Sequence, residues 1–128
     1  MSFAGRCGAD SPARREACAR VLALADASGV EQIRMGWCDQ HGQLRGKTLT
    51  RRALEKALAD GIGMVSTLLL KDTSDRTVYK VFEDGGVADL PGFEAASNLV
   101  LLPDPASFKL LPWASRTAWM QGQPWFQS

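Results

Sequence analysis

Few side chains in this sequence belong to the types that do covalent or metal chemistry. The single histidine, His41, lies in a Gln-His-Gly turn, where a solvated loop residue is expected. The three cysteines, Cys7, Cys18 and Cys38, are odd in number and far apart, so they predict neither a zinc site nor a disulfide framework. The one stretch similar to G-x-x-x-x-G lacks the Gly-Lys-Ser ending of a phosphate-binding loop. The residues therefore predict no self-sufficient catalytic set, and no cofactor or metal held by this chain.

Composition and charge describe an ordinary globular domain. The chain has 128 residues, 45% hydrophobic and 23% charged, which is enough for one domain. Fifteen basic and fourteen acidic side chains leave a net charge of +1, so we expect no nucleic-acid partner. The basic pairs Arg14-Arg15 and Arg51-Arg52 are interpreted as solvated helix faces. No apolar run approaches the ~18 residues of a membrane span and no signal peptide is recognised, so we expect a cytoplasmic protein without membrane contact.

Hydrophobic periodicity predicts a helix and a hairpin in the first half of the chain. A helix is predicted over Pro12–Ala27, because a serine precedes it as a cap and proline suits the first turn. Over Val30–Cys38 the period changes to two, which indicates a half-buried strand. A polar turn over 39–43 and a second strand over 44–49 complete the hairpin.

The rest of the chain alternates between apolar runs and turn-rich stretches. A helix over Arg51–Asp60 ends at Gly61, and the apolar run Ile62–Leu70 indicates a strand buried on both faces. Further short strands are predicted at Val78–Phe82, Leu99–Leu102, Phe108–Leu111 and Arg116–Met120. This order predicts an α+β fold of the β-grasp type, in which a helix packs across a mixed sheet and an N-terminal helix precedes it.

Four segments carry motifs in a specific order. Asp39–Lys47 reads D-x-x-G-x-x-R-G-K, and Ser97–Asp104 reads S-N-x-x-L-x-P-D. Phe108–Trp113 then ends in Leu-Pro-Trp, and Thr117–Met120 follows. In this order and spacing the segments resemble the N-terminal β-grasp domain of the glutamine synthetase family. The resemblance covers about Val30 to Phe126.

The resemblance implies the smaller part of a large ATP-dependent ligase. Family members phosphorylate the γ-carboxylate of glutamate, and ammonia or an amine then displaces the phosphate. By this resemblance residues 1–10 form a flexible leader, and residues 11–128 form the N-terminal domain with the start of the linker to a catalytic domain. The ATP site and the Mg²⁺ or Mn²⁺ site belong to that catalytic domain. This chain alone is therefore expected to be inactive.

The family's architecture also implies the partners. The catalytic domain is expected in cis, and a neighbouring subunit of a homo-oligomer in trans, whose active site the N-terminal domain completes. Near the end of the chain, Trp119, Met120, Trp125 and Phe126 form an apolar group that normally needs a partner. For this chain alone we therefore expect weak self-association or a disordered tail.

The polar loop after the third predicted strand gives the candidate catalytic residue. In family members an F-D-G-S-S-like loop brings an aspartate to the ammonium site, and Asp72 falls at the matching place. Such a carboxylate attracts ammonium or a protonated amine and accepts the proton that leaves before attack. Asp75 is the alternative, and Ser74 is a candidate substrate contact. Lys71 replaces the aromatic residue and Thr73 the glycine, so the choice between ammonia and an amine stays open.

Each of these features also has a structural interpretation. Asp72 can cap its own loop in an Asx-turn, and Arg45 and Lys47 share a strand face, where they could bind carboxylates or protect an exposed edge. Tryptophans are expected in the core or in an interface rather than in a ligand cage: Trp37, Trp113, Trp119 and Trp125.

The alternative for the whole chain is a free-standing β-grasp interaction or regulatory module without catalytic activity.

Overall fold

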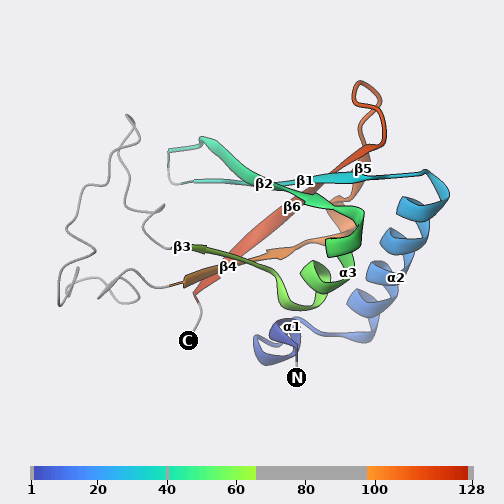
Figure 1. Cartoon of the computed structure of the whole chain (residues 1–128). Helices are drawn as coiled ribbons and strands as arrows, with labels where there is room; N and C mark the ends of the chain where they lie inside the picture. Colours follow the sequence, from blue (N-terminus) through green and yellow to red (C-terminus); the bar gives the residue numbers. More distant parts are fainter. Residues whose placement is uncertain (1, 40, 66–97, 127–128) are drawn as a thin grey trace.

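The computed structural model describes residues 2–39, 41–65 and 98–126 and shows helices packed on a mixed β-sheet (Figure 1). Its helices are α1 (Phe3–Arg6), α2 (Pro12–Ala27), α3 (Arg51–Asp60) and the 3₁₀ helix η2 (Pro105–Ser107). Its strands are β1 (Gln32–Cys38), β2 (Leu44–Thr50), β3 (Ile62–Val65), β4 (Asn98–Pro103), β5 (Lys109–Leu110) and β6 (Thr117–Phe126). The predicted α+β class is confirmed, including the helix across the sheet and the helix that precedes it.

Strand β6 lies at the centre of the sheet, whose order is β2-β1-β6-β4-β3 with β5 also paired to β6. Its first half runs parallel to β1, and its second half antiparallel to β4. The partner changes within one residue, because Gln121 pairs with Gly36 and Gly122 pairs with Pro103. The sheet therefore forks at this point, where β1 separates from β6.

The main core lies between the sheet and helices α2 and α3. Alternation along each strand directs every second side chain toward these helices. The core residues that are less than 2% exposed include Ile33, Met35, Leu54, Leu99, Leu101 and Met120. Leu24 of α2 does not take part, although its helical spacing from Val21 predicts the same apolar face, since Leu24 is 45% exposed.

A second apolar cluster on the opposite face of the sheet corrects the expectation of a flexible leader. Phe3 and Ala4 of α1 are buried against Val100 and Leu102 of β4, and the backbone N–H of Phe3 donates to Asp60 Oδ1 at 3.0 Å. A helix of four residues is too short to show a helical period, so the sequence pattern could not reveal it.

Two strands differ from their predicted form. Strand β3 lies at the edge of the sheet and Gly63 is exposed, so the expectation of burial on both faces is wrong for its described part. Strand β6 continues to Phe126 as a central strand, so the expected disordered tail is wrong up to that residue. The central position explains the apolar side chains there, because Met120 is fully buried in the main core. The predicted strand Val78–Phe82 lies outside the described residues.

Candidate functional site

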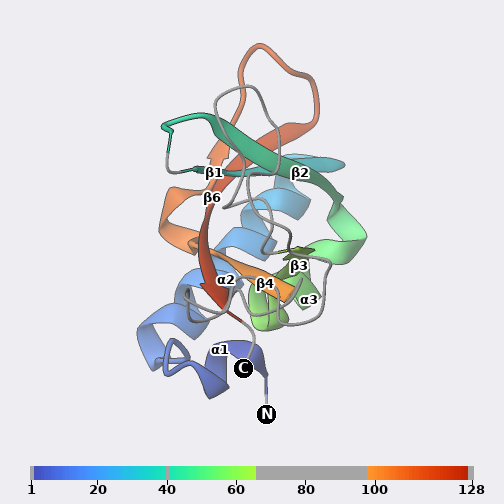
Figure 2. The same ribbon diagram turned by 90° about the vertical axis from the view of Figure 1, so that its left-hand side faces the viewer.

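The turn of the β1–β2 hairpin lies at the same end of the sheet as the last residue of β3 and the first of β4 (Figure 1, Figure 2). The candidate residues Asp72, Ser74 and Asp75 follow β3 in the sequence but lie outside the described residues, so their roles remain predictions. What the structure describes is the framework from which that segment of the sequence continues. That framework is the hairpin with the D-x-x-G-x-x-R-G-K motif.

Asp39, the first residue of the motif, closes the hairpin turn. Its side chain is fully buried, and its Oδ1 accepts the backbone N–H groups of His41 and Gln43, each at 2.9 Å. Its Oδ2 accepts the Nε–H of Arg45 at 2.8 Å. Charge-assisted hydrogen bonds of this kind are short and strong. The aspartate and the arginine of the motif are therefore partners in one ion pair that fixes the turn.

The same contacts control the protonation of Asp39. Burial alone would raise the pKa of its carboxyl, but the hydrogen bonds from Arg45 and from the N–H groups of His41 and Gln43 outweigh burial. The pKa of Asp39 is therefore lower than its usual value. The turn carries an aspartate that is ionised throughout the neutral range.

We expect acid to weaken this hairpin. The pKa of Asp39 in the folded protein lies below the unfolded value of about 3.9. The ionised carboxyl therefore makes its full contribution to stability at pH values above the unfolded pKa. This contribution is lost as the pH falls through the folded pKa. Thermal unfolding followed by circular dichroism, at neutral pH and at about pH 3, should show a smaller loss of midpoint for Asp39→Asn than for the wild type. Equal losses in the two proteins would contradict this role of Asp39.

The two glycines of the motif are required by the backbone. Gly42 adopts a φ of 74° in the turn, a left-handed conformation that glycine accepts without steric cost. A Cβ atom on Gly46 would lie 2.3 Å from the carbonyl oxygen of Met35 on the neighbouring strand. The close approach of β1 and β2 therefore leaves no room for a side chain at Gly46.

Arg45 and Lys47 do not simply protect the edge of the sheet. Register places them opposite the buried Trp37 and Met35, on the face that carries the main core. Strand β2 is an edge strand, as expected, but the ammonium group of Lys47 donates to the carbonyl oxygen of Gly63 at 2.6 Å. Lys47 thus ties the hairpin to β3, the strand that leads toward Asp72.

The tryptophans occupy different environments. Trp37 lies in the main core, as predicted, with 3% of its surface exposed. Trp119 lies against Gly36, where a Cβ atom would be 2.4 Å from its ring. Trp113 is 76% exposed in the loop between β5 and β6. The prediction of a position in the core is therefore wrong for Trp113.

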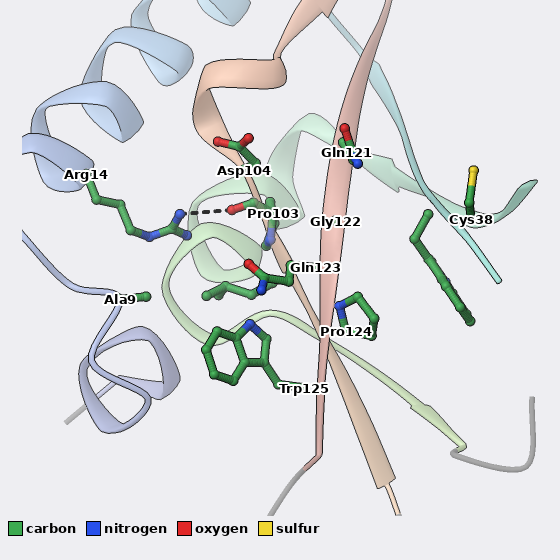
Figure 3. A pocket seen from close by; sticks show the side chains of 12 residues that line it. Ala9, Arg14, Cys38, Pro103, Asp104, Gln121, Gly122, Gln123, Pro124 and Trp125 are labelled. Carbon is green, nitrogen blue, oxygen red and sulfur yellow. Dashed lines mark hydrogen bonds between the residues drawn. The ribbon is translucent and has the colours of Figure 1, made fainter. Parts of the chain in front are cut away.

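A cleft of about 420 Å³ lies beside the second half of β6 (Figure 3). This cleft could not be predicted from the sequence, because its walls come from distant parts of the chain. They are the first turn of α2, the end of β4 and the fork between β1 and β6. Arg14, expected on a solvated helix face, instead donates to the carbonyl oxygens of Pro103 at 2.9 Å and Leu58 at 2.7 Å. A single helix turn carries no signal of such long-range contacts.

Three further observations concern the described residues only. Within them, no group of three or more histidine, cysteine, aspartate or glutamate side chains could hold a metal ion. None of the helices in these segments is long and apolar enough to span a membrane. Cys7, Cys18 and Cys38 carry free thiols.

The chain is similar in sequence to a known protein. No protein-family model matches the chain. The chain is 37% identical over 110 residues to γ-glutamylanilide synthase from Acinetobacter sp, and this alignment covers 84% of the chain but 22% of that protein.

Solved structures resemble the fold. A GmaS/ADP complex has a TM-score of 0.61 and 21% identity, over 84% of this chain and 20% of that one. Ligand-free GmaS has a TM-score of 0.60 and 20% identity, over 83% and 21%; at such identities both show the fold alone. A glutamine synthase homologue has a TM-score of 0.53 and 26% identity, over 74% and 21%. The chain thus spans about a fifth of the length of the proteins it matches.

Proposed function

Because this chain belongs to the glutamine synthetase family, we propose that it is the N-terminal domain of a larger ATP-dependent ligase that joins glutamate to an amine. The observation that carries the proposal is the 37% identity to γ-glutamylanilide synthase along 84% of the chain. Since the alignment covers only 22% of that protein, the parent would supply the catalytic domain in the part of its chain that this sequence lacks. In this proposal residues 11–128 are the domain and the start of its linker, and α1, which packs against β4, belongs to the same fold.

The domain acts on the active site of an adjacent subunit in a cytoplasmic homo-oligomer. ATP, with Mg²⁺ or Mn²⁺ in the catalytic domain, supplies the phosphoryl group that activates the γ-carboxylate of glutamate. Asp72 attracts the cationic form of the nitrogen donor and then accepts a proton from it, so that a lone pair becomes available for attack. Asp75 is the alternative for this role, and Ser74 is a candidate substrate contact.

The described framework supports this assignment by its position. In the sequence Asp72 is seven residues after Val65, the last residue of β3. That end of β3 lies at the end of the sheet where the hairpin turns (Figure 1). The Asp39–Arg45 ion pair fixes that turn, and Lys47 holds the hairpin to β3 through Gly63. A catalytic group must be held by supporting contacts if it is to act in a defined geometry.

We expect the parent to prefer an amine to ammonium, because the relative by sequence is a γ-glutamylanilide synthase. The purified parent would be given glutamate, ATP and Mg²⁺ with aniline, an alkylamine or ammonium as the nitrogen donor. Mass spectrometry of the products should show a γ-glutamyl amide of an amine in excess of glutamine. Glutamine as the main product would move the proposal to a glutamate–ammonia ligase. If no donor gives a product, the alternative of an interaction module is favoured.

A further inference from the structure

The cleft beside β6 has a wall of three polar-tipped side chains from alternate positions of that strand. Gln121, Gln123 and Trp125 share one face of β6, since successive side chains point to opposite faces. All three line the cleft, together with Arg14 of α2 (Figure 3). The cleft exists because β1 leaves β6 after Gln121, so that no strand of the described residues covers this part of β6 on the β1 side.

Two residues that line the cleft carry buried hydrogen-bond donors with no acceptor among the described residues. The indole Nε1–H groups of Trp37 and Trp125 are both buried without an acceptor in the described part of the chain, and both residues line the cleft. Buried donors without a partner are rare in native proteins, and a bound acceptor is one way to satisfy them. In Figure 3 the ring nitrogen of Trp125 lies on the side of the indole that faces Gln123 and Pro103.

The cleft also contains a positive charge that no carboxylate neutralises within the described segments. Arg14 donates to two backbone carbonyls, which are neutral acceptors, and forms no ion pair with a described acidic residue. Asp104 also lines the cleft, and its Oδ1 accepts the backbone N–H of Ala106 and caps η2. The guanidinium has five N–H donors, so it keeps donors for a further acceptor.

We propose that this cleft binds a carboxylate group. A carboxylate is negatively charged and only accepts hydrogen bonds, so it complements a guanidinium, an indole N–H and the side-chain amide of Gln123. The apolar surfaces of Leu102 and Trp125 fit an aliphatic stem beside it. The carboxylate can come from a small dicarboxylate or from an acidic side chain of another protein segment. The proposal does not depend on ligase activity, because it concerns binding to this domain alone.

The test uses the indole N–H signals of the ¹⁵N-labelled 128-residue chain. The chain would be titrated with glutarate, with a glutamate-rich peptide and with glutaramide, the neutral diamide of glutarate, at constant ionic strength. We expect saturable downfield movement of the Trp125 signal with a carboxylate probe, no such movement with glutaramide, and an unchanged signal for the exposed Trp113. Tighter binding of glutarate identifies a small-molecule source, and tighter binding of the peptide a protein source.

Variants show whether the cleft is the site. Arg14→Gln and Gln123→Leu should each weaken binding, by about tenfold for the removed charge, whereas Arg20→Gln on the same helix should not. Arg20 is a matched control, because it pairs with Glu16 at 3.1 Å and does not line the cleft. Gln123→Leu keeps the test valid if loss of Arg14 unfolds the chain, since Gln123 is exposed. No saturable movement with either carboxylate, equal movement with glutaramide, or unchanged affinity in Gln123→Leu would overturn the proposal.

Discussion

Replacement of Asp72 by asparagine in the full-length parent should lower amine-dependent turnover by about 10²-fold or more. Asparagine keeps the shape of the side chain and can still cap a loop, but it has neither the charge that attracts a cationic donor nor the base that accepts its proton. The expected loss therefore belongs to the chemical step. ATP binding and oligomer assembly should be unchanged, as measured by calorimetry and light scattering.

Asp75→Asn is the matched control for this experiment. If Asp72 performs the role, the Asp75 variant should keep most of its activity. A loss in the Asp75 variant alone would transfer the role to Asp75. Normal turnover in both variants would remove this loop from the mechanism and leave the Asx-turn as the function of Asp72.

The isolated chain of 128 residues should show no ATP-dependent ligation, while the parent is active. Phosphoryl transfer depends on groups that position the nucleotide and neutralise its charge, usually with divalent metal ions. We assign these groups to the catalytic domain. Phosphate release from ATP would be measured with glutamate, an amine and Mg²⁺ or Mn²⁺, with the parent at the same concentration as the control. Metal-dependent turnover by the isolated chain above background would contradict the assignment.

Local signals explain which elements could be predicted from the sequence. Helices α2 and α3 have the predicted bounds, because each combines helical periodicity with a glycine shortly after its last residue. Ser11 accepts the backbone N–H of Arg14 at 3.1 Å, and Gly61 ends α3 with a φ of 72°. The hairpin was predicted for the same reason, since its alternating strand residues and its turn residues are neighbours in the sequence.

Long-range packing explains what the sequence could not show. Phe3 is buried because α1 meets β4, and its burial depends on a strand almost 100 residues later in the chain. The cleft depends on the change of partner along β6, which no local pattern records. Helical spacing alone also overestimated the apolar face of α2, because Leu24 lies outside the main core. Candidate catalytic residues came from the family resemblance alone, since no metal or triad pattern marked them.

The central claim is that this domain completes the active site of a neighbouring subunit. The most direct measurement mixes two inactive forms of the parent: one with Asp72→Asn, and one with an intact Asp72 but a catalytic domain inactivated by mutation. In randomly assembled homo-oligomers of an equimolar mixture, about a quarter of the interfaces would join an intact Asp72 to an intact catalytic domain. Ligation should return to about this fraction of wild-type turnover after subunit exchange. If the mixed assemblies remain as inactive as the separate variants, each active site lies within one subunit and the account is contradicted.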